Sequence, residues 1–379
     1  MTGSDDWWQG ISGPQAEAVG DGYRVTFWWR DPAGSEETSL TKRVWIYITG
    51  VTDHHQNAVP QTLKRVPGTD AWQWQTTLSP AWRGSYCFIP SDRDDDFAPE
   101  IFNGGSPDRT LLREGWRRLL PRAIADPLNP QSWKGGRGHA VSALELPLAP
   151  EQPGWSLRNT PYQPPVCIEW HSARLGNTRR IWVYTTGEAV AAERPLAVLL
   201  DGQFWAESMP VWSALAGLTR EAKLPPAVYL LIDVIDNEHR SRELPCHADF
   251  WLAVQEELLP RVHQIAPFSD RADRTVVAGQ SFGGLAAMFA ALYWPQRFGC
   301  VLSQSGSYWW PHRGGAQTGL LIERLSQGVL RPHGLRIWLE AGEREPLIFR
   351  ANQALLSQLQ QTQQTIFWRQ VDGGHDALC

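Results

Sequence analysis

The chain has 379 residues, of which 42% are hydrophobic and 20% are charged. This length predicts two domains, and the apolar content excludes an intrinsically disordered chain. The net charge of −5 and the lack of a dense basic run exclude nucleic acid as an expected partner. No apolar run reaches the roughly 20 residues of a membrane helix, so we expect no membrane insertion. The 21 Trp residues, against 12 Phe and 8 Tyr, indicate either flat-ring ligands or aromatic cores.

The five cysteines are odd in number and scattered, and none forms a C-x-x-C pair. This pattern predicts reduced thiols rather than disulfides or a metal site. The N-terminal sequence is acidic and lacks the basic flank and apolar run of a secretory signal. We therefore expect a cytoplasmic protein with no metal or organic cofactor.

The first 150 residues contain short segments rich in β-branched and aromatic side chains, separated by turn residues. They lie at 24–30, 42–49 and 72–78. Regular spacing of such strands, with few helical patterns, predicts an all-β sandwich of the immunoglobulin-like kind over residues 1–150. Six prolines between Pro147 and Pro165 then favour extended backbone, so we expect a linker over 151–165.

Residues 166–379 alternate apolar runs with helical patterns. An initial hairpin is expected around Gly176-Asn177, and helices are expected over 249–259 and 284–293. Short apolar runs without alternation are typical of strands buried on both faces, and they lie at 196–200, 227–232, 274–278, 300–303, 336–339 and 365–368. The second domain is therefore predicted to be α/β, with helices on both faces of one sheet.

The sharpest chemical signal is Gly279-Gln-Ser281-Phe-Gly283, which follows an apolar strand and opens an Ala-rich helix. This is a G-x-S-x-G nucleophile elbow in its strand-turn-helix context. Glycines allow the tight turn, and the helix start directs amide groups toward developing negative charge. The pattern favours Ser281 as a nucleophile over an ordinary Gly-rich turn.

A serine hydroxyl needs a base, and His375 follows the last apolar run in Asp372-Gly-Gly-His-Asp376. The chain order nucleophile, acid, histidine predicts an acid after the strand at 336–339. Glu345 is the preferred acid and Glu343 the second choice, with Asp372 and Asp376 as distant alternatives. A solvated loop histidine and solvated acidic residues remain the competing interpretations.

An oxyanion hole needs two backbone donors. The amide of Phe282, directly after the nucleophile, is one candidate. The second is the amide of Gln203, in the loop after the strand at 196–200, where Gly202 allows close backbone approach. A plain turn is the alternative for this loop.

Several of these segments together resemble one family. They are Val25-Thr-Phe-Trp-Trp-Arg30, Leu200-Asp-Gly-Gln-Phe-Trp205, Asp236-Asn-Glu-His-Arg-Ser-Arg-Glu-Leu244, Gly279-Gln-Ser-Phe-Gly-Gly284 and Gly373-Gly-His375. With these segments the chain resembles the enterochelin (enterobactin) esterases over essentially its whole length. The resemblance implies an α/β-hydrolase domain of the esterase D-like superfamily, with Ser281 as nucleophile and His375 as base. A Glu stands where many relatives have the acid Asp.

The resemblance also implies the substrate, the trilactone of ferric enterobactin and its glucosylated relatives. Hydrolysis to dihydroxybenzoyl-serine units would release iron in the cytoplasm. Such a trianionic catecholate complex needs cations and flat rings around it. Arg240 and Arg242 are the candidate cations, with solvated ion pairs as the alternative. The candidate rings, for which core packing is the alternative, are Trp205, Trp309, Trp310 and His312.

Two other functions remain open at this point. One is a general carboxylesterase, feruloyl esterase or acyltransferase on the same scaffold. The other is a siderophore-binding protein without catalysis, because fold does not fix function. The sequence predicts that residues 1–150 enclose the substrate, since their Trp-rich strands exceed what a small sandwich core needs. It leaves the oligomeric state undetermined.

Overall fold

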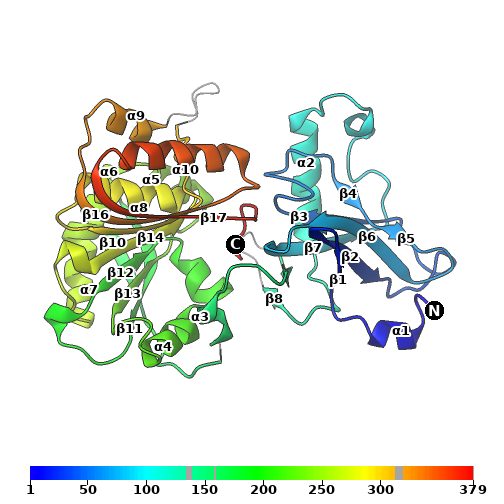
Figure 1. Ribbon diagram of the computed structural model, residues 1–379, viewed down its shortest axis with the longest axis horizontal. Coiled ribbons are helices and arrows are strands. Elements are labelled where there is room, and N and C mark those ends of the chain that lie inside the picture. The colour runs from blue at the N-terminus through cyan, green and yellow to red at the C-terminus, as the bar shows by residue number, and fades with distance from the viewer. Residues whose placement is uncertain (134–138, 158, 312–318, 379) are drawn as a thin grey trace. The chain divides into compact units, whose positions relative to one another are not determined.

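The computed structural model describes residues 1–133, 139–157, 159–311 and 319–378 (Figure 1). The chain divides into two compact units. The first unit comprises Met1–Pro150 together with the segments Gly342–Glu345 and Val371–Cys379. The second unit comprises Glu151–Ala341 and Pro346–Gln370. Two short segments distant in sequence thus belong with the N-terminal residues.

Two antiparallel sheets form a β-sandwich in the first unit, as the strand pattern predicts. One sheet has the order β1 (Gln15–Val19), β2 (Gly22–Arg30), β6 (Ala71–Leu78), β5 (Lys64–Arg65). The other has the order β4 (Gln61–Thr62), β3 (Arg43–Ile48), β7 (Arg83–Ser91), β9 (Val141–Glu145), β8 (Ser132–Trp133). Phe27 from the first sheet and Ile46 from the second lie in one core, so the two sheets pack face to face.

The first unit also contains helices, which the all-β expectation missed. A short helix α1 (Asp5–Gln9) begins the chain, and α2 (Arg109–Leu119) packs on the outer face of the second sheet. Tyr47 contacts Trp116 of α2, with ring centroids 5.2 Å apart. Leu112, Trp116 and Leu119 recur at helical spacing, and Asp108 caps the helix, but charged residues between them obscure the pattern.

The second unit contains one eight-stranded sheet. Its order is β10 (Val166–Ser172), β11 (Asn177–Thr185), β13 (Val228–Ile232), β12 (Leu196–Leu199), β14 (Thr275–Gln280), β15 (Cys300–Gln304), β16 (His333–Gly342), β17 (Gln363–Val371). β10 and β11 form the expected antiparallel hairpin, and β12 to β16 pair in parallel. The carboxyl ends of β12 to β16 therefore lie at one edge of the sheet.

Helices cover both faces of this sheet, as Figure 1 shows. α4 (Trp212–Arg220) packs on one face through Trp212, close to α3 (Pro153–Ser156). The other face is covered by helices that include α6 (Ala248–Ala253), α7 (Leu259–Ile265), α8 (Phe282–Tyr293), α9 (Leu320–Ser326) and α10 (Pro346–Leu359), while α5 (Asn237–Glu243) follows β13 along the chain. The helix expected over 249–259 is interrupted by a π-helical segment at Val254–Leu258.

Most of the conspicuous tryptophans serve the cores. Trp45, Trp82 and Trp116 are fully buried in the first unit, and Trp170 and Trp251 are fully buried in the second. Their number therefore reflects packing more than ligand binding. Among the residues that the structure describes, no helix is long and apolar enough to cross a bilayer.

Candidate active site

Ser281 stands between β14 and α8 on a strained turn. Its φ of 57° and ψ of −119° are unfavourable for a residue with a side chain, and such strain gathers at functional sites. Gly279 makes the turn possible, because a Cβ there would lie 2.4 Å from the carbonyl carbon of Gly283. The expected elbow is thus present, with Ser281 directly before a buried helix.

Neighbouring loops hold the elbow in place. The Ser281 amide donates to the carbonyl oxygen of Gln304 at the end of β15, at 3.0 Å. The Ser281 hydroxyl lies 3.2 Å from the hydroxyl of buried Ser307, whose amide donates to the Ser281 carbonyl oxygen. The sequence gives no signal for Ser307, since it contacts Ser281 only through the pairing of β14 and β15.

The loop after β12 lies against the elbow. Gly202 has no room for a side chain, because a Cβ would be 2.5 Å from the amide nitrogen of Ile232. Asp201, at a φ of 54°, accepts two hydrogen bonds from Arg240, from Nε at 2.6 Å and from Nη2 at 2.9 Å. Arg240 Nη2 also approaches the carbonyl oxygen of Gln280, at 3.4 Å. This ion pair links the loop that carries Gln203 to the residue before Ser281.

Arg240 stays charged in this position. Burial would lower its pKa, but the hydrogen bonds and the charge of Asp201 outweigh burial and raise the pKa. Its guanidinium lies 5.7 Å from the centre of the Phe282 ring, and Trp309 lies 6.0 Å from the same ring. A cation and two aromatic rings therefore lie together beside Ser281.

His375 and Glu345 form a hydrogen-bonded pair in the first unit. Nδ1 of His375 lies 2.7 Å from Oε2 of Glu345, which is fully buried. An ionised carboxylate only accepts, so Nδ1 carries the proton and Nε2 is left as the basic atom. Glu343, the second choice from the sequence, is exposed.

Backbone hydrogen bonds join the two segments that carry this pair. The amide of Glu343 donates to the carbonyl oxygen of Val371, and the amide of Arg344 donates to that of Gly373. Gly342 leaves space for the acid, because a Cβ there would lie 2.6 Å from Oε1 of Glu345. Asp372 and Asp376 have other partners: Arg344 pairs with Asp372, and Ser85 donates to Asp376.

The remaining predicted ligand residues have different surroundings. Arg242 is 54% exposed and lies 3.7 Å from Glu243. Trp205 packs against the cluster that covers one face of the sheet, and Trp310, like Trp309, packs against the cluster on the other. His312 lies outside the described residues.

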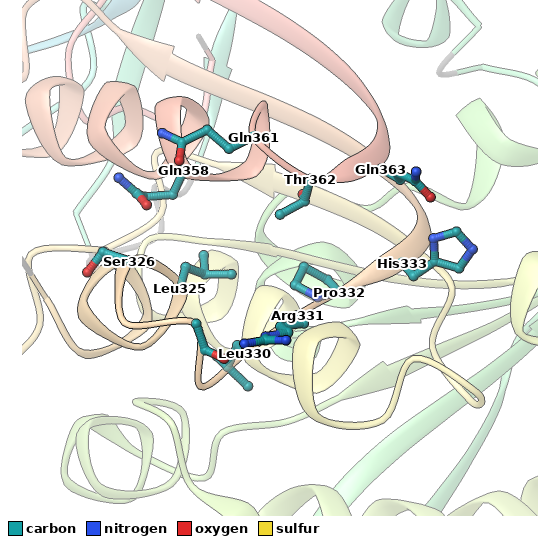
Figure 2. Close-up of a pocket in the computed structure, with 11 residues that line it drawn as sticks. Leu325, Ser326, Leu330, Arg331, Pro332, His333, Gln358, Gln361, Thr362 and Gln363 are labelled. Atoms are coloured by element: carbon teal, nitrogen blue, oxygen red, sulfur yellow. Dashed lines mark hydrogen bonds between the residues drawn. The ribbon is translucent and has the colours of Figure 1, made fainter.

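A pocket of about 360 Å³ lies elsewhere in the second unit (Figure 2). His333 and Gln363 on its wall begin β16 and β17, whereas Ser281 follows the carboxyl end of β14. The pocket therefore belongs to the opposite edge of the sheet and carries none of the candidate catalytic residues. Within the described ranges, no three His, Cys, Asp or Glu side chains gather as a metal site would require.

Two protein families match the chain, and they divide it near the proline-rich segment. Residues 24–155 match the family described as "Enterochelin esterase, N-terminal". Residues 172–377 match the family described as "Putative esterase". This matched range contains both Ser281 and His375. Together these matches cover most of the strands of the three sheets.

Curated relatives resemble the chain along its whole length. The chain is 68% identical to iron(III) enterobactin esterase of Escherichia coli O6:H1 (strain CFT073) over 378 residues, which cover 100% of this chain and 93% of the relative. It is 67% identical, with the same coverage, to the protein of that name from Escherichia coli K12. An iron(III) salmochelin esterase of the CFT073 strain is 28% identical over 95% of this chain and 85% of the relative.

Solved structures of similar proteins agree with this fold. A crystal structure of ferric enterobactin esterase from Salmonella typhimurium superposes with a TM-score of 0.94 at 66% identity, covering 99% of this chain and 95% of that one. The enterobactin esterase of Shigella flexneri, crystallised in the presence of enterobactin, gives a TM-score of 0.90 at 65% identity, covering 100% and 95%. The chain belongs to the iron(III) enterobactin esterase family.

Proposed function

We propose that this chain is a serine esterase that hydrolyses the trilactone esters of iron(III) enterobactin to dihydroxybenzoyl-serine units, so that iron can leave. The observation that carries the chemistry is Ser281 on its strained elbow. The substrate assignment is supported by 68% identity with an iron(III) enterobactin esterase across the whole chain. Iron enters this reaction only as part of the substrate.

The first step is formation of an acyl-enzyme. Nε2 of His375 takes the proton of the Ser281 hydroxyl while the oxygen attacks a seryl ester carbonyl. Glu345 accepts a hydrogen bond from Nδ1–H of His375 and stabilises the imidazolium that forms. The amides of Phe282 and Gln203 donate to the oxyanion. The imidazolium then protonates the departing seryl alkoxide.

The second step is hydrolysis of the acyl-enzyme. Nε2 of His375 takes a proton from water, whose oxygen attacks the acyl carbonyl. The imidazolium returns the proton to the Ser281 oxygen as the carboxylic acid leaves. Two features support this triad. Ser281 follows β14, and Glu345 follows β16, whose carboxyl end lies at the same edge of the sheet as that of β14.

Substrate binding is assigned to the groups around the elbow. The complex is anionic and presents flat catechol rings, which suit a guanidinium and aromatic side chains. We propose that Arg240 and Arg242 supply the positive charge and that Trp309, Trp310 and Trp205 line the site. Residues 1–150 are proposed to enclose the substrate. We place the reaction in the cytoplasm, in line with the free thiols of Cys87, Cys167, Cys246 and Cys300.

The test is Ser281→Ala with mass spectrometry of the products from iron(III) enterobactin. We expect turnover to fall by at least about a thousandfold, while binding of the iron complex persists. Labelling by a fluorophosphonate should also disappear in this variant. Near-normal turnover in Ser281→Ala would overturn the proposal, and failure of the wild type to be labelled would favour a binding protein.

A general esterase is the second candidate, because the match over residues 172–377 carries only the description "Putative esterase". Comparison of enterobactin, a glucosylated enterobactin and a simple phenolic ester separates the two. We expect the largest kcat/KM for the catecholate trilactones. A larger value for the phenolic ester would favour the general esterase.

A further inference from the structure

The loop that carries His375 is fastened to the β-sandwich on both sides of the histidine. Asp372, three residues before it, accepts a hydrogen bond from the hydroxyl of Ser79, which follows β6. Asp376, directly after it, accepts hydrogen bonds from the backbone amide of Ser85 in β7, at 2.7 Å, and from its hydroxyl. Hydrogen bonds to charged groups are among the stronger ones in proteins. Two carboxylates thus hold the loop against two serines of the sandwich.

The backbones also meet directly at this point. Gly374, the residue before His375, would place a Cβ 2.4 Å from the carbonyl oxygen of Thr49. Gly50, with a φ of 78°, would place one 2.8 Å from the Cα of Gly374. Neither position accommodates a side chain. The turn after β3 therefore packs against the histidine loop without intervening atoms.

The same turn places a second imidazole beside the first. The ring of His55 lies 5.0 Å from the ring of His375, centroid to centroid, with an interplanar angle of 58°. Such a tilted contact is typical of packed aromatic rings. His55 also packs on His54, with ring centroids 4.2 Å apart. His375 thus has Glu345 at Nδ1 and His55 against its ring.

The position of His55 is held by a strained and well-fastened turn. His55 and Gln56 both have left-handed backbones, with φ of 56° and 60°, which are unfavourable for residues with side chains. The carboxylate of buried Asp53 offsets this backbone strain. It accepts hydrogen bonds from the backbone amides of Gln56, of Asn57 at 2.8 Å and of Ala58 at 2.6 Å. Unfavourable backbone conformations that the surrounding structure stabilises are found most often at functional sites.

We propose that the β-sandwich positions the catalytic base: Ser79 and Ser85 fix the loop on both sides of His375, and His55 packs against its imidazole. The three are positioning residues that act through His375, so the inference rests on His375 being the base of the proposed esterase. A role limited to enclosing substrate differs in its consequences. Enclosure affects only large substrates, whereas positioning affects every reaction of Ser281.

The test uses the double variant Ser79→Ala/Ser85→Ala in the full chain. We expect kcat on iron(III) enterobactin and the rate of Ser281 labelling by a small fluorophosphonate both to fall about tenfold, with KM little changed, because a misplaced base slows each reaction. Ser39→Ala is the matched control, since Ser39 donates to buried Asp31 at 2.6 Å in the same sandwich, outside the histidine loop. It should keep the wild-type rates.

Two pairs of single variants separate positioning from loss of fold. Ser85→Thr keeps a hydroxyl and should restore most of the rate that Ser85→Ala loses. His55→Ala should lower the labelling rate, whereas His55→Phe, which keeps a ring, should stay within about threefold of wild type. These single variants also replace the double variant if it fails to fold.

The outcomes distinguish this inference from the proposed function. If wild type is not labelled, or if Ser281→Ala retains turnover, the esterase assignment itself fails. If wild type is labelled and the serine and His55 variants are labelled at its rate, only the positioning role is overturned. A raised KM for enterobactin with unchanged labelling would likewise overturn it, in favour of enclosure alone.

Discussion

The proposed nucleophile, Ser281, and the proposed base, His375, are held by two different kinds of structure. Ser281 sits on a turn whose geometry is set within five residues by Gly279 and Gly283, between a central strand and a buried helix. His375 lies in an irregular segment held by side chains that are remote in sequence: Ser79 and Asp372 are 293 residues apart. A nucleophile elbow can therefore be recognised from a short motif, whereas the placement of the base depends on most of the chain.

The largest expected effect concerns the hydrogen-bonded pair of Glu345 and His375. Glu345→Gln should lower kcat about 10³- to 10⁴-fold, as loss of the acid does in serine proteases, because the amide no longer stabilises the imidazolium. Steady-state hydrolysis of iron(III) enterobactin measures this. Glu343→Gln, at an exposed position two residues away, should leave kcat unchanged. Equal effects of the two substitutions would contradict the assignment of the acid.

A buried ion pair in the second unit offers a test of how much a buried charge pair contributes to the stability of the fold. Arg179 on β11 donates to Glu243 of α5 at 2.5 Å, with 1% and 4% of their side chains exposed. Arg179→Met should lower the free energy of unfolding by up to about 3–5 kcal/mol, because the buried carboxylate of Glu243 loses its buried cation and keeps only Asn177 and the more distant, exposed Arg242. Urea unfolding measures this.

Two controls accompany that substitution. Arg271→Met breaks a pair that is about half exposed and should change the free energy by less than about 0.5 kcal/mol. The double variant Arg179→Met/Glu243→Leu should recover much of the loss. A loss as large for Arg271→Met as for Arg179→Met would show that burial is not the cause.

The local character of the elbow can be tested at Gly279. Gly279→Ala forces a Cβ against the backbone of Gly283 and should destabilise the protein by about 1–3 kcal/mol while abolishing labelling of Ser281. Gly105→Ala, where a Cβ meets nothing within 4 Å, should be neutral in both measurements. Retained labelling in Gly279→Ala would mean that the turn tolerates more than its geometry indicates.

The smallest effect is a pH dependence in the histidine loop. Burial would raise the pKa of Asp372, but hydrogen bonds from Arg344 and Ser79 outweigh it and lower the pKa. A lowered pKa stabilises the fold at pH values above the unfolded carboxyl's pKa of about 3.9, and this contribution disappears as pH falls through the folded value.

Asp372→Asn should therefore reduce the free energy of unfolding by up to about 1 kcal/mol at pH 7, and the difference from wild type should shrink below pH 4. Urea titrations at pH 7 and pH 3 measure the two values. A difference that grows as the pH falls would contradict the sign.

The sequence predicted the parts of the site whose geometry is local. The elbow at 279–283 and the strands of the second unit follow from glycine spacing and apolar runs. The preference for Glu345 over Glu343 came from its distance beyond the turn at Gly342, and the structure adds that Glu345 is buried whereas Glu343 is exposed. His55 carried no signal, since its contact with His375 joins segments from opposite ends of the chain.

The first unit, because it includes segments from near the end of the sequence, can be completed only late in synthesis. Both sheets of the β-sandwich are synthesised early, yet Ser79 and Ser85 meet their carboxylate partners only after residues 372 and 376 have emerged. The sandwich and the elbow at Ser281 are both synthesised before His375 and the carboxylates Asp372 and Asp376 that flank it. A nascent chain should therefore hold an elbow without a base, and esterase activity should begin only when synthesis has passed residue 376.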